Sequence, residues 1–201
     1  MKIGILDIQG SVEEHLEALR KLAKGGSKIE PVLVKAAEDL EKVRGLIIPG
    51  GESTTIGKLL RRFGLREEII RRAKSGEMAI WGTCAGAILL AKKIIGSQKA
   101  DTLELMDIEI ERNAYGRQLE SFETQVEFDL GFGTLGRIVP AIFIRAPMIV
   151  NVGKKVEVLA RHNSEIVAAR DGNLLATNFH PELTDDLLVH EYFLKMCRNG
   201  L

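Results

Sequence analysis

The sequence predicts an α/β fold with a mixed, mostly parallel central sheet flanked by helices. Apolar β-prone runs alternate with helical patterns through the first half of the chain. Further along, the runs become short and are separated by turn residues, which is typical of antiparallel strands. Repeated strand–helix units imply parallel strands covered on both faces, because each crossover helix lies against the sheet. We expect residues 1–201 to form one domain, since this length is ordinary for a single core.

The order of the elements follows from the pattern. Strands are expected at residues 2–8, 30–35, 45–49 and 78–81, and helices at 11–25, 54–63 and 65–74. Ser11 and Glu14 have the spacing of a capping box that begins the first helix. The later strands are expected at residues 122–128, 141–145, 155–161, 166–170 and 174–178, and a closing helix at 185–198.

Composition excludes several classes of function. The 28 basic and 28 acidic residues cancel, so no positive patch for nucleic acid is expected. No apolar stretch reaches the roughly 18 residues of a membrane span, and no signal peptide is expected at Met1. Because the chain has only two cysteines, we do not expect a disulfide framework, and we expect a cytoplasmic location. No metal cluster and no nucleotide-binding fingerprint is found in the sequence, so we expect no cofactor.

Cys84 is the first candidate for chemistry. It is the central residue of Gly82-Thr83-Cys84-Ala85-Gly86, which follows a predicted strand and precedes a helical run. This pattern is a nucleophile elbow, in which glycines let the backbone double back and the central residue is strained. A cysteine at a helix N-terminus is favoured as a thiolate by the helix dipole. Cys84 is therefore the predicted nucleophile.

His180 is the candidate base. It ends the predicted strand at 174–178 and is followed by Pro181 and Glu182. Pro181 favours an extended residue before it, and residues two apart in an extended segment share a face. Glu182 is therefore expected to orient the His180 imidazole and to stabilise its protonated form. His15 and His190 are interpreted as packing or surface residues of the first and last helices.

A third strand end carries a glycine-rich loop. Gly50 and Gly51 follow the predicted strand at 45–49. Consecutive glycines leave backbone N–H groups accessible, and such groups suit an oxyanion hole. Because parallel strands end at one edge of a sheet, this loop, Cys84 and His180 are expected to meet there.

Together these motifs resemble the class I glutamine amidotransferases, which have a flavodoxin-like three-layer fold. Within that group the chain resembles the glutaminase subunit of pyridoxal 5′-phosphate synthase over its whole length. The segments that carry the narrower resemblance are Leu6-Asp7-Ile8-Gln9-Gly10-Ser11, Pro49-Gly50-Gly51-Glu52-Ser53-Thr54-Thr55, Arg112-Asn113-Ala114-Tyr115-Gly116-Arg117-Gln118, Ser121-Phe122-Glu123 and Phe143-Ile144-Arg145-Ala146-Pro147. Asp7 and Tyr115 depart from the family pattern.

The resemblance implies a role for each matching residue. Hydrolysis of L-glutamine to L-glutamate and ammonia would use Cys84, His180 and Glu182 as the catalytic triad. The oxyanion hole would be formed by Gly50, Gly51 and Ala85. The residues implied in glutamine binding are Gly51, Glu52, Ser53, Arg112, Ile144 and Arg145. An arginine is physically suited to the α-carboxylate of glutamine, because its guanidinium forms paired hydrogen bonds with carboxylates.

The resemblance also implies a partner, a synthase subunit that makes pyridoxal 5′-phosphate from ribose 5-phosphate, glyceraldehyde 3-phosphate and channelled ammonia. A large assembly with equal numbers of both subunits is implied, with low glutaminase activity in the isolated chain. Two alternatives stay open. One is the glutaminase of another amidotransferase, such as imidazole glycerol-phosphate synthase. The other is a cysteine hydrolase or stress protein on a similar elbow fold.

Overall fold

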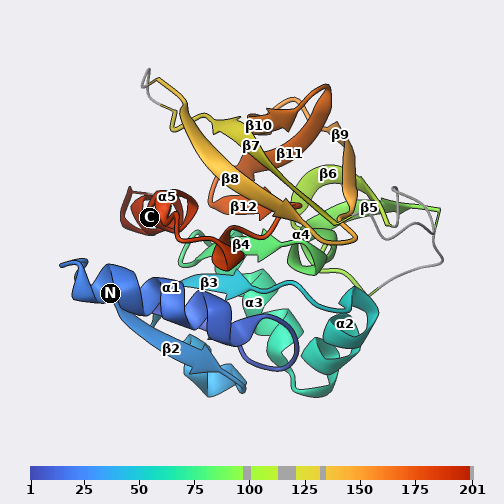
Figure 1. Cartoon of the computed structure of the whole chain (residues 1–201). Helices are drawn as coiled ribbons and strands as arrows, with labels where there is room; N and C mark the ends of the chain where they lie inside the picture. The colour runs from blue at the N-terminus through green and yellow to red at the C-terminus, as the bar shows by residue number, and fades with distance from the viewer. Residues whose placement is uncertain (97–100, 113–120, 132–134, 200–201) are drawn as a thin grey trace.

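The computed structural model of the chain describes residues 1–96, 101–112, 121–131 and 135–199. Within these ranges the strands join into one curled sheet with helices around it (Figure 1). The strands are β1 (Lys2–Leu6), β2 (Glu30–Val34), β3 (Val43–Ile48), β4 (Ala79–Thr83), β5 (Ala91–Ile95), β6 (Met106–Glu111), β7 (Phe122–Phe128), β8 (Arg137–Phe143), β9 (Met148–Val152), β10 (Glu157–His162), β11 (Glu165–Asp171) and β12 (Leu174–Thr177). The α-helices are α1 (Val12–Lys24), α2 (Ser53–Arg62), α3 (Leu65–Lys74), α4 (Ala85–Leu90) and α5 (Leu188–Asn199), and the 3₁₀ turns are η1 (Ala37–Leu40) and η2 (Pro181–Leu183).

The sheet combines a parallel part with an antiparallel part. The order is β2-β1-β3-β4-β12-β11-β10-β7-β8, and the first five of these strands are parallel. From β12 onward the pairs are antiparallel, and β9 joins the β5–β6 pair to β11. The prediction of a mixed α/β sheet flanked by helices is confirmed.

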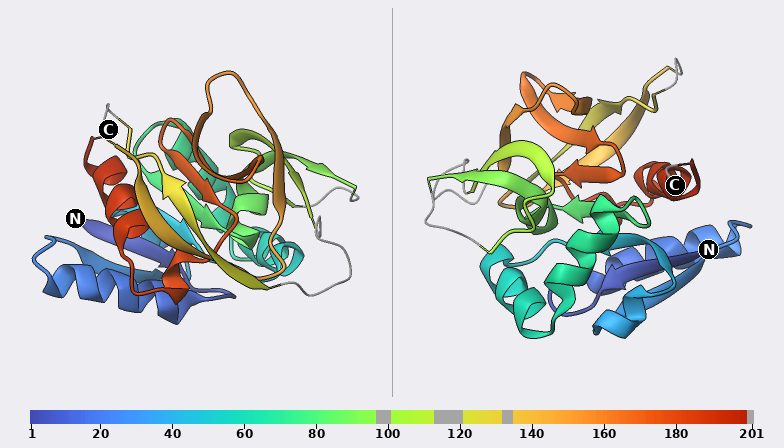
Figure 2. Two further views of the ribbon diagram at one scale, coloured as in Figure 1. Left: turned by 45° about the horizontal axis from the view of Figure 1, so that its top comes forward. Right: turned by 180° about the vertical axis from the view of Figure 1, so that it is seen from behind.

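The helices cover both faces of the parallel strands, with a hydrophobic core on each face. α1 and α5 pack on one face, over a core that includes Trp81 and Phe193. α2, α3 and α4 lie on the other face, over a core that includes Leu46 and Ile80. Figure 2 shows α1 and the group of α2 and α3 on opposite sides of the sheet. Strands buried on both faces explain why these runs are almost continuously apolar in the sequence.

Two local expectations are corrected by the structure. The strand expected at 141–145 is β8, which runs from Arg137 to Phe143 and ends before Ile144. Arg145 has a positive φ of 44°, which breaks the extended geometry. Ser11 is the N-cap residue of α1 but its side chain makes no capping hydrogen bond, so the capping box is wrong. The hydroxyl bonds to Glu182 instead.

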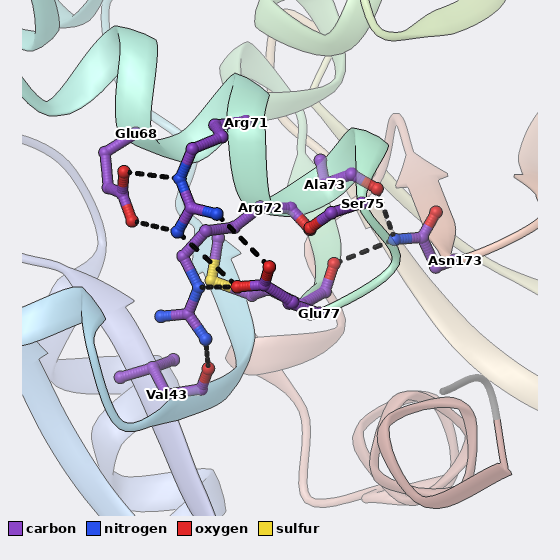
Figure 3. A network of polar contacts seen from close by, with 9 residues as sticks. Val43, Glu68, Arg71, Arg72, Ala73, Ser75, Glu77 and Asn173 are labelled. Atoms are coloured by element: carbon purple, nitrogen blue, oxygen red, sulfur yellow. Dashed lines mark hydrogen bonds and ion pairs between the residues drawn. The ribbon is translucent and has the colours of Figure 1, made fainter.

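A polar network fixes the end of the sheet opposite the predicted site. There, Arg72 donates to the Val43 carbonyl oxygen, and Arg71 is paired with Glu68 and Glu77 (Figure 3). Asn173, in the turn before β12, donates to two carbonyl oxygens that flank the α3–β4 connection, at 3.0 and 2.8 Å. These bonds tie the start of β4 to β12, and β4 leads directly to Cys84.

Candidate active site

The strand register brings the predicted catalytic segments to one edge of the sheet. β4 lies between β3 and β12, with Gly82 opposite Ile48 on one side and Thr83 opposite Thr177 on the other. The segments that follow β3, β4 and β12 therefore all begin at the same edge of the sheet. Cys84 continues the contact, since its N–H donates to the Thr177 carbonyl oxygen at 2.8 Å.

Cys84 lies at the tight turn between β4 and α4. Its φ of 49° and ψ of −102° are unusual for a residue with a side chain, as expected for an elbow. The flanking glycines are needed for close approach. A Cβ on Gly82 would lie 2.4 Å from the Gly86 carbonyl carbon, and one on Gly86 would lie 2.1 Å from the Ile48 carbonyl oxygen. Only glycine fits at these two positions, and the two glycines allow the chain to make the tight turn.

His180 and Glu182 are in direct contact. His180 Nδ1 lies 2.7 Å from Glu182 Oε1, and both side chains are buried. The predicted pairing is present, but the extended segment expected to produce it is not. Residues Pro181–Leu183 form a 3₁₀ turn with proline at its first position, a position that proline favours because its N–H is missing. The turn, rather than a shared strand face, brings Glu182 back to His180.

The electrostatics of the pair favour a charged His180. Burial lowers the pKa of His180, but hydrogen bonds to Cys84 and Glu182 outweigh it and raise the pKa to about 10. Burial raises the pKa of Glu182, but the hydrogen bond to His180 and the positive charge of that ring outweigh it and lower the pKa to about 2. Glu182 is therefore an anion at neutral pH, and His180 can hold the proton that a thiol gives up.

The Gly50–Gly51 loop is held against this pair by the chain between β1 and α1. The Gly50 carbonyl oxygen accepts from the Ser11 N–H at 3.0 Å, and Gln9 Oε1 accepts from the Glu52 N–H at 2.8 Å. Gly50 has no room for a side chain, since a Cβ there would lie 2.5 Å from His180 Cε1 and 3.5 Å from Cys84 Cβ. The predicted oxyanion loop therefore touches both His180 and Cys84.

These segments enclose a cavity of about 490 Å³. Of the residues predicted to act on or bind a substrate, all except Glu182 line it: Cys84, His180, Gly50, Gly51, Ala85, Glu52, Ser53, Arg112, Ile144 and Arg145. Glu182 lies behind His180, with its side chain fully buried. The cavity is large enough for one small polar molecule beside the sulfur.

One wall of the cavity carries paired charges. Glu52 is the N-cap of α2, and its carboxylate accepts from the Thr54 and Thr55 N–H groups at 3.0 and 2.6 Å. Hydrogen bonds from Thr55 are the main cause that lowers the Glu52 pKa to about 2. Arg112 Nη2 donates to Thr54 Oγ1 at 3.1 Å and lies 3.4 Å from Glu52 Oε1. An anionic and a cationic group thus stand side by side, which suits the charged ends of an amino acid.

Three residues that support this site were not predicted from the sequence, and two of them, Gln9 and Ser11, also line the cavity. Ser11 Oγ donates to Glu182 Oε1 at 2.9 Å, and Gln9 supports the glycine loop. His15 Nε2 lies 3.6 Å from Glu182 Oε2. Gln9 and Ser11 belong to a segment that resembles the glutaminase subunit, and this resemblance was their one sign of a role at the site. Nothing in the local pattern of His15 distinguishes it from a core residue.

Two departures from the family pattern have different outcomes. Asp7 forms an ion pair with Lys35 at 3.1 Å, outside the cavity lining. Tyr115, with the rest of the segment at 113–118, lies outside the described residues. In the part of the chain that the structure describes, no helix is long and apolar enough to cross a membrane. No group of three or more histidine, cysteine, aspartate or glutamate side chains there is arranged to hold a metal ion.

Comparisons with known proteins agree with this geometry. Residues 5–199 match the SNO glutamine amidotransferase family. The chain is 54% identical to a Niallia circulans protein named pyridoxal 5′-phosphate synthase subunit PdxT, over all of both chains. It is 52% identical to the protein of the same name from Pseudothermotoga lettingae, covering 98% of this chain and 96% of that one.

Solved structures show the same likeness. A crystal structure of a glutamine amidotransferase superposes with a TM-score of 0.89 at 45% identity, covering 98% of each chain. The structure of PurLQS from Thermotoga maritima superposes with a TM-score of 0.70, covering 98% of this chain and 97% of that one. At 16% identity this second likeness concerns the fold alone.

Proposed function

Because the chain belongs to the SNO glutamine amidotransferase family, we propose that it is the glutamine-hydrolysing subunit of pyridoxal 5′-phosphate synthase. The observation that carries the proposal is the position of Cys84. It lies on a strained elbow, hydrogen-bonded to a charged histidine, at the wall of a cavity sized for an amino acid. Two relatives that match this chain over nearly their whole length, with 54% and 52% sequence identity, carry the name of this subunit.

During the reaction His180 holds the proton that the Cys84 thiol gives up, which its raised pKa favours. The sulfur attacks the side-chain amide carbon of glutamine, and a tetrahedral intermediate forms. His180 then gives its proton to the departing nitrogen, the carbon–nitrogen bond breaks and ammonia leaves. A water molecule, deprotonated by His180, attacks the resulting thioester, and cleavage of the carbon–sulfur bond releases glutamate. Glu182 orients the imidazole and stabilises its positive charge throughout.

The remaining lining residues bind rather than react. Backbone N–H groups of Gly50, Gly51 and Ala85 would stabilise the oxyanion of the intermediate. Arg112 would bind the α-carboxylate of glutamine, and its position in the cavity lining, where it donates to Thr54 Oγ1, supports this role. Contacts to the rest of glutamine are assigned to Gly51, Glu52, Ser53, Ile144 and Arg145, which line the same cavity.

The fate of the ammonia requires a partner. Free ammonia in water at neutral pH is protonated and loses its nucleophilicity, so it would pass directly to the synthase subunit that makes pyridoxal 5′-phosphate from ribose 5-phosphate and glyceraldehyde 3-phosphate. We further propose an assembly with equal numbers of the two subunits. A cytoplasmic location is supported by the two unpaired cysteines, and a single domain over residues 1–201 by the family match at 5–199.

The test is an assay of the chain with its synthase subunit, glutamine and both sugar phosphates. Glutamate and pyridoxal phosphate should form together. Cys84→Ala should abolish glutamate formation, and added ammonium salt should restore pyridoxal phosphate synthesis. Cys197→Ala is the matched control, because this buried thiol lies in α5 and burial raises its pKa to about 12. Glutamate release by the Cys84→Ala variant would refute the mechanism.

The same assay separates the alternatives. The glutaminase of imidazole glycerol-phosphate synthase would not support pyridoxal phosphate synthesis with this partner. A cysteine hydrolase or stress protein would release no glutamate from glutamine with or without it.

A further inference from the structure

Two fully buried histidines lie behind the His180–Glu182 pair, and the reaction above does not use them. His15, in α1, and His190, in α5, are both 0% exposed. His15 Nδ1 lies 3.1 Å from His190 Nε2, and His15 Nε2 lies 3.2 Å from Thr83 Oγ1. Thr83 is the residue directly before Cys84. Both rings also meet Trp81 in edge-on contacts, so they have little freedom to turn.

The two carboxylate oxygens of Glu182 face different side chains. Oε1 accepts from Ser11 and contacts His180, at 2.9 and 2.7 Å. Oε2 is buried and has no hydrogen-bond partner among the described residues. His15 Nε2 faces it at 3.6 Å, too far for a hydrogen bond but close enough for the carboxylate charge to act on the ring.

The protonation of the two rings follows from their surroundings. The titratable groups that act on His15 are Glu182, His180, His190 and Glu14. Burial is the main cause that lowers its pKa, and Glu182 only partly opposes it. Burial likewise lowers the pKa of His190 to about 3. Both rings are therefore neutral at neutral pH, with one N–H each.

The carboxylate decides which nitrogen of His15 carries the proton. A lone pair on His15 Nε2 would point at the negative charge of Glu182, whereas an N–H there is attracted to it. With the proton on Nε2, His15 donates to Thr83 Oγ1 and faces Glu182 Oε2, and Nδ1 accepts from His190 Nε2–H. This arrangement satisfies every contact of the His15 ring.

From this geometry we propose that His15 is a positioning residue for Glu182: its Nε2–H, fixed by His190, holds the carboxylate in the place from which it orients His180. The proposal rests on the triad of the proposed function and extends it by a fourth side chain, from a different helix. A packing role alone would require only the volume of the ring. A positioning role requires the Nε2 donor and acts only through Glu182.

Substitutions can separate these two roles. Asn can replace the Nδ1 contact of His15 but does not reach Thr83 or Glu182, whereas the longer Gln can supply an N–H near the position of Nε2. With the synthase subunit present, His15→Asn should lower kcat about 10- to 100-fold with little change in KM, the scale expected when an anion loses a stabilising donor. His15→Gln should recover most of the loss.

A double-mutant cycle with Glu182→Gln tests whether His15 acts through the carboxylate. In that background His15→Asn should change kcat less than about threefold, because the charge it stabilises is gone. The same loss in both backgrounds, or wild-type kcat for His15→Asn alone, would overturn the proposal. If Glu182→Gln and Cys84→Ala leave glutaminase activity intact, the proposed function itself fails, which is a different result.

A measurement on the unaltered chain covers the case in which His15→Asn does not fold. Nitrogen-15 NMR of the histidine rings between pH 6 and 8 should show His15 and His190 neutral, each with its proton on Nε2. A proton on Nδ1 of His15, or a charged His15, would overturn the proposal.

Discussion

Gly50→Ala is the sharpest test of how the three strand-end segments fit together. The added Cβ would lie 2.5 Å from His180 Cε1, and ordinary contact begins at 3.4 Å. The imidazole must therefore retreat by the difference, about 0.9 Å. The backbone φ of Gly50 lies outside the left-handed region, so alanine causes no backbone strain of its own. The added methyl group thus acts first on the position of His180.

The expected loss can be worked from this displacement. Misplacing a catalytic group by about 1 Å costs roughly 100-fold in rate, or about 2.7 kcal/mol in activation free energy. Overpacking of the loop should cost about 1–3 kcal/mol of unfolding free energy. We therefore expect a folded protein whose kcat for glutamine hydrolysis, with the synthase subunit present, is about 100-fold lower.

The control is Gly25→Ala at the end of α1. Its Cβ would lie 3.4 Å from the Lys21 carbonyl oxygen, an ordinary contact, and its φ of −73° suits alanine. Activity should not change, and the unfolding free energy should stay the same or rise slightly. A Gly50→Ala variant with kcat within threefold of the wild type would refute the assignment of His180 as the base held by this loop.

Three further predictions concern pH and stability. Because the folded-state pKa of His180 is raised to about 10, its stabilising contribution is fully present below about pH 6.5 and is lost as pH rises toward 10. The free energy of unfolding, measured with urea, should therefore fall less steeply over this pH range for His180→Gln than for the wild type. Equal slopes for the two proteins would contradict a charged His180–Glu182 pair. Asn173→Ala should lower the unfolding free energy by about 1–3 kcal/mol, because it removes the hydrogen bonds to the Ala73 and Met78 carbonyl oxygens. An unchanged midpoint of thermal unfolding would show that this network does not anchor β4. Lys35→Ala should change the unfolding free energy by less than about 1 kcal/mol, since its pairing with Asp7 is exposed to solvent, and a larger loss would give this departure from the family pattern a structural role.

Local chemistry explains why part of the site could be predicted. The elbow at Cys84 requires glycine on both sides, and this requirement is visible in five consecutive residues. Apolar runs that end in such loops predict parallel strands, and parallel strands end at one edge. The meeting of Cys84, His180 and the Gly50 loop therefore follows from sequence. The 3₁₀ turn at Pro181–Leu183 could not be predicted from the sequence, because an extended segment would also place Glu182 near His180.

What the sequence by itself determined is the set of groups that meet at the end of the parallel strands: a cysteine, a histidine with its glutamate, and a glycine loop. What only the tertiary structure decided is how that set is supported. Ser11, the residue before α1, and His15, within α1, reach Glu182 across 171 and 167 positions of the chain. The sequence pattern assigned Ser11 to a helix cap and His15 to packing or to the helix surface, because a local pattern describes neighbours along one helix. A buried carboxylate draws donors from whichever elements packing brings near, so these two partners became visible only in the folded chain.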